Sequence, residues 1–185
     1  RLALARVLEA IQDRGPDAQG LWLDPGGRIG LANARLSTSD ARPIANQPLM
    51  DLDETVVITF NGEIYNHVEL RQELTQRGAR FRTRSDTEVL LEAYKAYGTA
   101  MLPRLEGQFA FALYDLRRHT VVLVRDPMGI SPCYYTIRDG CLWFASEPRG
   151  LLQIPGFTRR LNVPEVYHYL VMESTYGDRL HPKGD

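Results

Sequence analysis

The sequence predicts an α+β domain in which helices lie outside packed β-sheets. Near the amino terminus, Leu4, Val7, Leu8 and Ile11 recur at the spacing of an amphipathic helix. From residue 108 onward the pattern is continuously that of strands, and in residues 108–115 (QFAFALYD) both faces are apolar. A strand that is buried on both sides needs a layer above and a layer below, made of helices or of a second sheet.

The amino-terminal half is expected to alternate helices with short strands. The opening helix ends at Asp13, because Gly15 and Pro16 do not continue a helix. A β-branched and aromatic run at residues 55–60 predicts a buried strand, which Asn61-Gly62-Glu63 is expected to stop. The other expected elements are strands at residues 21–23 and 28–35 joined by a turn at 25–27, a loop over 37–50, and a helix over 67–77 closed by Gly78.

A second strong helix is expected after Ser85, because Ser85 and Glu88 have the S-x-x-E spacing of a capping box. In that motif the serine oxygen accepts an early backbone N–H, and the glutamate reaches back to the N–H of the serine. The helix ends at Gly98. The remaining expected elements are strands at residues 108–115, 120–125, 133–137 and 141–145, a pair of helices within 147–170, and a polar end at 173–185.

Composition excludes several classes of function. The 185 residues carry 22 Lys plus Arg against 23 Asp plus Glu, a net charge of −1, so nucleic-acid and anionic-membrane binding are not expected. There is no apolar run long enough to span a bilayer and no signal-peptide pattern. The two cysteines cannot form a disulfide framework, and the four histidines show no metal-ligand spacing. We therefore expect a cytoplasmic protein without a metal site.

Seven motifs together resemble one known family. In chain order the motifs are RGPD (14–17), ARLS (34–37), FNGEIYN (60–66), SDTEVLL (85–91), GQFAFALYD (107–115), RDPMGISPCYY (125–135) and FASEPRGLL (144–152). In these motifs the chain resembles the glutaminase domain of glutamine-hydrolysing asparagine synthetases, which are class II glutamine amidotransferases. The resemblance implies an α/β/β/α sandwich of the N-terminal-nucleophile hydrolase type, with two packed, mainly antiparallel sheets. It also implies a glutaminase domain at residues 1–152, followed at 153–185 by trailing helices and the start of a linker towards a synthetase domain.

Three charged residues are candidates for binding the α-carboxylate and α-amino groups of glutamine. The planar guanidinium of Arg35 can grip both oxygens of a carboxylate, as the matching arginine does in the family. The resemblance assigns the substrate's amino group to Glu63 and Asp86. Two alternatives remain open: Arg35 in a surface salt bridge, and Asp86 in the first turn of a helix only to stabilise that helix. Similarly, RGPD either shapes the floor of the site, as in the family, or supplies Arg14 and Asp17 as an ion pair.

Asn61 and Gly62 are the candidate oxyanion hole. A side-chain amide and a backbone N–H can converge on one oxygen, and glycine lets a ligand approach the backbone closely. The alternative for an Asn-Gly pair is a simple hairpin turn. The neighbouring residues favour the oxyanion hole, because the family carries NGEIYN at this point.

The catalytic nucleophile of the family is an amino-terminal cysteine, whose own α-amino group serves as the base. This sequence begins Arg1-Leu2-Ala3-Leu4, which matches family sequence downstream of that cysteine. We expect the nucleophile on an upstream segment, since Cys133 and Cys141 fall on expected strands away from the NGE turn. An open alternative is a cysteine-less relative that binds glutamine or acts as a scaffold.

The resemblance also fixes what the domain is expected to lack. In the family, ATP is bound by an SGGxDS loop of the synthetase domain, and neither that loop nor a phosphate-binding glycine motif occurs in this sequence. We expect no cofactor in this domain, with ATP and magnesium confined to the synthetase domain. The expected partners are glutamine, the synthetase domain of the same full-length chain and, as an open question, a second copy in a homodimer. The sequence departs from the family at Ala32-Asn33-Ala34 and at Asn46-Gln47-Pro48, so we expect the polar contacts around Arg35 to differ from those of the family.

Overall fold

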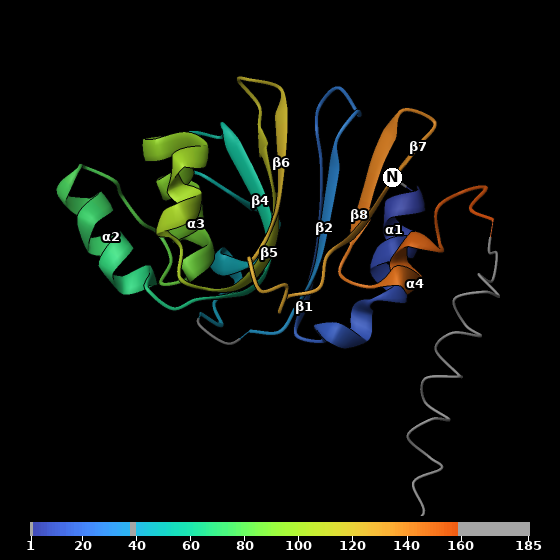
Figure 1. The fold of residues 1–185 in the computed structure, drawn as a ribbon, viewed down its shortest axis with the longest axis horizontal. Coiled ribbons are helices and arrows are strands. Elements are labelled where there is room, and N and C mark those ends of the chain that lie inside the picture. The colour runs from blue at the N-terminus through green and yellow to red at the C-terminus, as the bar shows by residue number, and fades with distance from the viewer. Residues whose placement is uncertain (1, 38–39, 159–185) are drawn as a thin grey trace, which may run out of the picture. The chain divides into compact units, whose positions relative to one another are not determined.

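In the computed structural model the fold is built from antiparallel sheets (Figure 1). The structure describes residues 2–37 and 40–158. The chain divides into two units, Arg1–Pro155 and Gly156–Asp185, and the following architecture is that of the first unit. A four-stranded sheet has the order β3-β4-β5-β6, and two hairpins, β1-β2 and β7-β8, form two-stranded sheets. The strands are β1 (Ala18–Leu23), β2 (Gly30–Arg35), β3 (Leu49–Met50), β4 (Val56–Ile64), β5 (Gly107–Asp115), β6 (Thr120–Arg125), β7 (Tyr134–Arg138) and β8 (Cys141–Ala145).

Helices cover the outer sides of the sheets. α2 packs on α3, which lies against β4, and α1 contacts β2 and α4 (Figure 1). The α-helices are α1 (Leu2–Ala10), α2 (His67–Gln76), α3 (Asp86–Tyr97) and α4 (Pro148–Leu151), with 3₁₀ turns at Gln12–Arg14, Pro43–Ala45 and Gly98–Arg104. The predicted α+β layering, helix–sheet–sheet–helix, is confirmed. No helix in the described ranges is both long and apolar enough to cross a bilayer.

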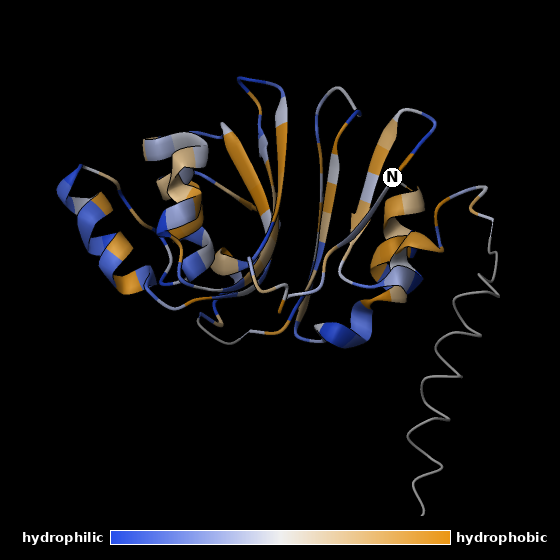
Figure 2. Ribbon diagram, in the orientation of Figure 1, coloured by the Kyte–Doolittle hydropathy of each residue, from blue (hydrophilic) through white to orange (hydrophobic). Residues whose placement is uncertain are grey.

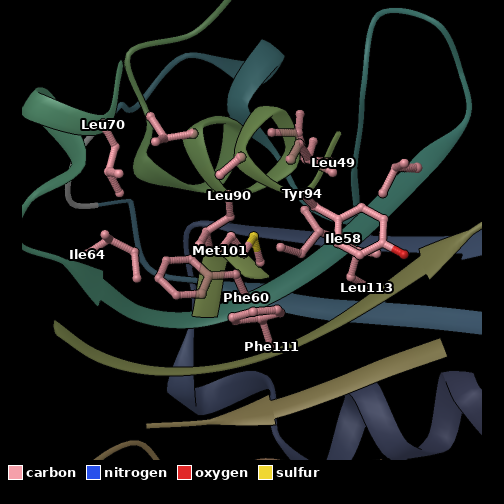
Figure 3. Close-up of a cluster of buried hydrophobic side chains, with 14 of the residues drawn as sticks. Leu49, Ile58, Phe60, Ile64, Leu70, Leu90, Tyr94, Met101, Phe111 and Leu113 are labelled. Carbon is pink, nitrogen blue, oxygen red and sulfur yellow. The ribbon is translucent and has the colours of Figure 1, made fainter. Parts of the chain in front are cut away.

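Strand β5 is the centre of the domain and is buried on both faces, as its sequence predicts. One face carries Phe109, Phe111 and Leu113, which pack with residues of α3 and β4 such as Leu90 and Ile58 in the larger core (Figure 3). The other face carries Ala112 and Tyr114, which pack with Leu31, Val57 and Trp22 against the β1-β2 hairpin. One strand therefore serves two cores, which is why it needs apolar residues at successive positions.

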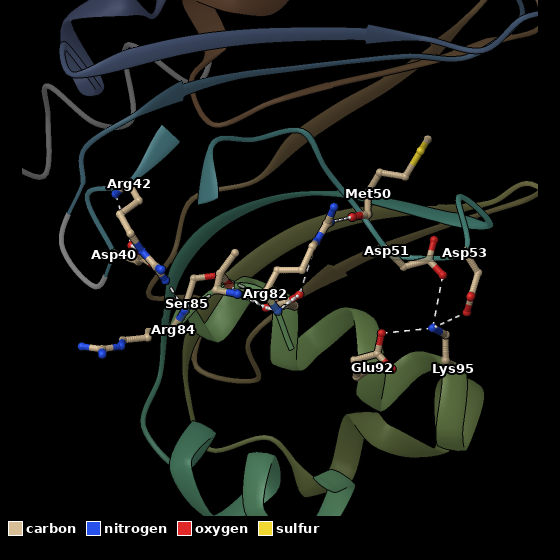
Figure 4. Close-up of polar contacts among 12 residues, drawn as sticks. Asp40, Arg42, Met50, Asp51, Asp53, Arg82, Arg84, Ser85, Glu92 and Lys95 are labelled. Atoms are coloured by element: carbon tan, nitrogen blue, oxygen red, sulfur yellow. Dashed lines mark hydrogen bonds and ion pairs between the residues drawn. The ribbon is translucent and has the colours of Figure 1, made fainter. Parts of the chain in front are cut away.

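The helices turn their apolar sides towards these cores. In α2, Leu70 and Leu74 are buried one turn apart, whereas the rest of the helix is largely polar (Figure 2). Helix α3 is tied to the loop between β3 and β4 by Lys95, whose Nζ lies 3.3 Å from Asp51, 2.8 Å from Asp53 and 3.0 Å from Glu92 (Figure 4).

The inner layer on the α1 side consists of two hairpins rather than one continuous sheet. Strands β2 and β8 do not pair with each other in the described part of the chain. Residues from both strands line one cavity. The resemblance implies two packed, mainly antiparallel sheets, and in the described residues the layer on this side is divided between the two hairpins.

Strand β4 corrects one prediction. Asn61-Gly62-Glu63 was expected to stop the strand after Phe60, but β4 runs on to Ile64 and pairs with β5 along its whole length. The physical reason is a close approach of the two backbones. A Cβ on Gly62 would lie 2.1 Å from the carbonyl oxygen of Gln108, and a Cβ on Gly107 would lie 2.2 Å from that of Glu63. The glycines therefore permit pairing at this point instead of ending it.

The capping box of α3 is only half confirmed. The Ser85 oxygen accepts a hydrogen bond from the Glu88 N–H, at 3.4 Å, as expected. Glu88 does not reach back to Ser85. Its carboxylate accepts bonds from the backbone N–H groups of Arg82 and Thr83 and from the Thr83 hydroxyl, at 2.7–3.1 Å. Glu88 thus fixes the loop that enters the helix, a tertiary role that the motif alone does not predict.

The ends of several other strands and helices differ by a few residues from those predicted. Strand β1 begins at Ala18, earlier than expected, and β7 begins at Tyr134, which leaves Cys133 in the preceding loop. The loop predicted over residues 37–50 contains a 3₁₀ turn and the short strand β3. Of the helices expected within 147–170, only α4 falls in the described range; the remainder of that prediction, like the polar end at 173–185, lies outside the described residues.

Candidate functional site

One cavity of about 740 Å³ brings the predicted site residues together. Its walls come from the β1-β2 hairpin, the central strands β4 and β5, the start of α3, the helix α1 and the β7-β8 hairpin. All five candidates line it: Arg35, Asn61, Gly62, Glu63 and Asp86. Residues from separate motifs therefore face a single hollow, which is the arrangement that a small amino-acid ligand requires.

The inward faces of β2 and β4 form one wall of the cavity, and every second residue of each strand faces inward. Leu31 of β2 packs with Val57 of β4 in the smaller core. Two residues further along each strand, the Asn33 Nδ2 group donates to the Thr59 hydroxyl oxygen at 3.1 Å. Because side chains two apart lie on the same face of a strand, the next inward residues are Arg35 and Asn61, and both line the cavity. The wall thus changes from apolar to polar towards the site.

Arg35 is not a surface residue, since only 7% of it is exposed. Its Nη1 group donates to Asn46 Oδ1 at 2.9 Å, and its Nη2 group donates to the backbone carbonyl of Asp40. These two bonds use two of the five N–H donors of a guanidinium and orient its plane. The surface salt bridge considered as an alternative is therefore wrong, and the loop departure at Asn46 turns out to supply a partner for Arg35.

The loop that holds Arg35 is itself anchored by a charged pair. The Asp40 carboxylate accepts bonds from Arg42 Nε at 2.8 Å and Nη2 at 2.6 Å, and from the backbone N–H of Arg84 at 2.8 Å (Figure 4). The hydrogen bond from Arg42 is the main cause that holds the pKa of Asp40 well below its usual range. This carboxylate connects the loop under Arg35 to the start of α3.

The RGPD motif supports the backbone of Arg35. A Cβ on Gly15 would lie 2.3 Å from the backbone of Ala34, and Asp17 N–H donates to the Arg35 carbonyl at 3.1 Å. The ion pair between Arg14 and Asp17 considered as an alternative is wrong. Arg14 pairs with Glu147 at 2.9 Å, and the Asp17 carboxylate accepts the Ser37 N–H at 2.8 Å.

Asn61 and Gly62 lie inside β4 and not in a hairpin turn, so the turn alternative is wrong. They pair with Ala110 and Phe109 of β5. Gly62 has φ +140°, in a region that side chains disfavour, and there is no room for a Cβ against Gln108. The Asn-Gly pair is therefore held rigidly by the central strand at the cavity wall.

The two acids occupy different environments. Asp86 is only 6% exposed, and its Oδ2 accepts the backbone N–H of Ile64 at 3.1 Å. Burial raises the pKa of Asp86 above its ordinary value, and the bond from Ile64 and the nearby His67 act in the opposite direction. Glu63 is exposed at the rim of the same cavity. The pair thus offers one desolvated and one solvated carboxylate to a cationic group.

Further polar residues of the cavity were not predicted as site residues: Asn33, Gln47, Thr59, His67, Thr87 and Gln108. His67 was expected at the surface or as a cap, but its Nδ1 atom is buried and has no hydrogen-bond partner in the described ranges. Strand alternation is the signal that could have found two of them. Asn33 and Thr59 stand two residues before Arg35 and Asn61 on the same faces.

The two cysteines also line this cavity, on the side of the β7-β8 hairpin. They were expected on strands away from the NGE turn; Cys133 instead lies in the loop before β7, and Asn61 lines the same cavity. Cys141 is opposite Arg138 in the hairpin, and Cys133 lies five residues before Arg138. Burial raises the pKa of Cys133, which disfavours its thiolate.

Comparison with known proteins decides the family. Residues 2–181 match the family model described as a glutamine amidotransferase domain. The chain belongs to this family. The fold of this amidotransferase domain is similar to that of an allosteric regulatory enzyme of purine biosynthesis, with TM-score 0.70 and 22% identity over 82% of this chain and 40% of the other. A glutamine phosphoribosylpyrophosphate amidotransferase of B. subtilis gives 0.68 and 21% over 81% and 40%. The predicted N-terminal-nucleophile hydrolase fold is thereby confirmed.

Curated relatives of the amidotransferase domain are considerably longer than this chain. The asparagine synthetase [glutamine-hydrolyzing] 1 of Bacillus subtilis (strain 168) is 44% identical over 149 residues, which are 80% of this chain and 23% of the relative. A putative asparagine synthetase [glutamine-hydrolyzing] of Mycobacterium tuberculosis (strain ATCC 25618 / H37Rv) is 38% identical over 182 residues, 92% and 28% respectively. The chain thus spans about a quarter of the length of these relatives. The predicted kinship with asparagine synthetase glutaminase domains is confirmed.

Proposed function

We propose that this domain hydrolyses glutamine to glutamate and supplies the ammonia to a synthetase domain of the same full-length chain. That synthetase domain would form an amide on aspartate or a related acceptor, and it would bind the ATP and magnesium. The family and the names of the longer relatives support this proposal. The observation that carries it is the shared cavity of Arg35, Asp86 and the Asn61-Gly62 pair.

The charges of the cavity match a free amino acid. Arg35 would bind the α-carboxylate through the guanidinium donors that Asn46 and Asp40 leave unused. Glu63 and Asp86 would bind the α-ammonium group, which would also compensate the buried charge of Asp86. The side chain of glutamine would then extend towards Asn61 and Gly62.

The reaction needs stabilisation of the oxyanion that forms when a nucleophile attacks the side-chain amide. The Asn61 amide and the Gly62 N–H would donate to that oxygen, and β4 holds both in place before substrate binds. Preorganised donors of this kind act without rearrangement in the transition state. Each typically contributes about 3 kcal/mol to lowering the barrier.

We propose that the nucleophile is a cysteine upstream of Arg1, as in the family. The raised pKa of Cys133 argues against Cys133, because a protonated thiol attacks poorly. Cys141 lies at the far end of the β7-β8 hairpin from Cys133. On this proposal residues 1–185 are inactive alone, and the substrate groups described above serve a nucleophile from outside them.

The test measures glutamate release by the full-length protein. Asn61→Ala should lower kcat by about 10²–10³-fold, as expected for an oxyanion donor. The matched control is Gln76→Ala, which removes an exposed amide at the end of α2 and should leave the rate unchanged. An Asn61→Ala protein with the wild-type rate would contradict the mechanism. Glutamine binding in calorimetry without any glutamate release would instead favour the cysteine-less alternative.

A further inference from the structure

Strand β4 has an open edge beside the oxyanion residues. Its neighbour β3 is only two residues long and pairs with Val57 and Ile58. In the described residues no other strand continues this pairing, so from Thr59 to Ile64 β4 has a strand on one side alone, β5. A backbone N–H of this stretch that points away from β5 therefore needs a partner that is not a strand.

The Gly62 N–H is one of the groups that point away from β5. Gly62 lies opposite Phe109. The Phe109 N–H donates to Asp126 Oδ2 at 3.2 Å, and the Phe109 carbonyl oxygen accepts the Asp126 N–H at 2.7 Å, on the β6 side of β5. In such a pair of an antiparallel ladder, both residues direct their backbone groups outward. The Gly62 N–H therefore faces the open edge of β4, and Gly62 is exposed and lines the cavity.

The outward N–H groups before and after Gly62 are bound by side chains. The Phe60 N–H donates to Gln47 Oε1 at 2.6 Å, and the Ile64 N–H donates to Asp86 Oδ2 at 3.1 Å. Gln47 and Asp86 both line the cavity. The two side chains thus take the place of a neighbouring strand on either side of Gly62.

The side chain of Gln47 is itself held by its neighbours. Its Oε1 also faces Asn33 Nδ2 at 3.3 Å, and because that oxygen can only accept, Asn33 must turn its nitrogen towards it and its own oxygen away. Its Nε2 donates to the Thr87 hydroxyl oxygen at 3.3 Å. Only 8% of Gln47 is exposed, and its backbone packs so closely on β1 that Gly20 has no room for a Cβ. One buried amide therefore joins β4 to β2 and to the start of α3.

These bonds anchor β4 on both sides of the oxyanion residues. Gln47 binds Phe60 and also the start of α3. From the same end of α3, Asp86 binds the last residue of β4. We propose that Gln47 is a positioning residue: by holding Phe60 it fixes the Asn61 side chain and the Gly62 N–H in the direction that the oxyanion requires. This inference rests on the proposed glutaminase function.

The role predicts a loss of turnover without a matching loss of substrate binding. Arg35 and Asp86 are held by hydrogen bonds of their own, to Asn46, to the Asp40 carbonyl and from the Ile64 N–H. The oxyanion forms only as the reaction proceeds, so misplaced donors weaken the transition state and spare the bound substrate. A misplacement of about 1 Å typically lowers the rate by about a hundredfold.

The experiment measures kcat and KM for glutamate release by the full-length protein. Gln47→Met keeps the approximate size of the side chain and leaves the Phe60 N–H without its acceptor. It should lower kcat by about tenfold to a hundredfold and change KM by less than about threefold. Leu74→Ala is the control for lost stability, because it empties part of the core beneath α2, away from the cavity. It should leave kcat and KM unchanged below its unfolding temperature.

Gln47→Asn carries the same test if Gln47→Met does not fold. The shorter amide cannot reach Phe60 from the same backbone position, and water can fill the space that it leaves. Three results would each overturn the inference while the proposed function stands: a wild-type kcat in the folded variant, a rise in KM as large as the fall in kcat, or an equal fall of kcat in Leu74→Ala. A wild-type protein that releases no glutamate overturns the proposed function, and the inference with it.

Discussion

The carboxylate of Asp86 accepts the backbone N–H of Ile64 at 3.1 Å. This bond joins the first residue of α3 to the last residue of β4. It therefore holds a buried acid beside Glu63 and beside the Asn61-Gly62 pair, which are 23 to 25 residues earlier in the chain. Helix-dipole stabilisation, the alternative for Asp86, remains compatible with this position, but it does not account for the bond to β4.

Asp86→Asn is expected to raise the stability of the folded protein at pH 7 and to lower its affinity for glutamine. Asparagine can still accept the Ile64 N–H, but it removes the buried charge. Because burial raises the folded-state pKa of Asp86, the folded protein binds this proton more tightly than the unfolded chain does. Stability therefore falls as pH rises through that pKa, and the variant should be more stable than wild type at pH 7. Its glutamine affinity should fall by about tenfold to a hundredfold.

Urea unfolding at pH 7 and pH 4, with calorimetry for glutamine, checks this prediction. The stability difference between variant and wild type should shrink at the lower pH, where Asp86 takes up its proton. Asp86→Ala is the control, since it also removes the acceptor for Ile64 and should destabilise the fold by about 1–3 kcal/mol. A variant that is less stable than wild type at pH 7 would contradict the role of burial.

Gly62→Ala is expected to disturb the pairing of β4 with β5. The added Cβ would meet the Gln108 carbonyl oxygen at 2.1 Å, and φ +140° is strained for alanine. We expect a loss of more than about 3 kcal/mol in the free energy of unfolding, because backbone strain alone typically costs about 1–3 kcal/mol. Gly78→Ala is matched in having a positive φ, +94°, but it meets nothing within 4 Å. Equal losses in the two variants would show that the close approach is unimportant.

Arg35→Lys is expected to weaken glutamine binding more than turnover. Lysine keeps the charge but cannot hold Asn46 and the Asp40 carbonyl while gripping a carboxylate with two parallel donors. KM for glutamine should rise by about tenfold to a hundredfold, with a smaller change in kcat. Steady-state kinetics of the full-length protein measure both. Arg80→Lys, at an exposed position, should leave KM unchanged; an unchanged KM in Arg35→Lys would remove Arg35 from the site.

Glu88→Ala is expected to destabilise the protein more than loss of the helix cap itself. The Glu88 carboxylate satisfies the Arg82 and Thr83 N–H groups and the Thr83 hydroxyl, and only 3% of the residue is exposed. Its removal should cost about 2–4 kcal/mol, against about 1 kcal/mol for Ser85→Ala. Thermal and urea unfolding compare the two, with the exposed Glu69→Ala as a control near zero. The reverse order would mean that the capping bond dominates.

Much of the fold could be predicted from the local pattern of apolar and polar residues. The predictions that were wrong share one physical cause. Residues 108–115 were predicted as a strand buried on both faces, and β5 is that strand. The predictions that failed, the end of β4 at Asn61 and the return of Glu88 to Ser85, depend on contacts outside the local pattern. Gln108 pairs with Glu63 at the end of β4, and Thr83 supplies more donors to Glu88 than Ser85 does.

The identities of Arg35, Asn61, Gly62, Glu63 and Asp86 could be read from the motifs, because each residue type carries a definite chemistry. Their convergence on one cavity is a property of the packed sheets, since strand pairing and the bond from Ile64 to Asp86 act across long stretches of chain. The direction of the Asn33 oxygen belongs wholly to the tertiary structure. An amide has a donor end and an acceptor end, and only the surrounding groups decide which end faces which neighbour.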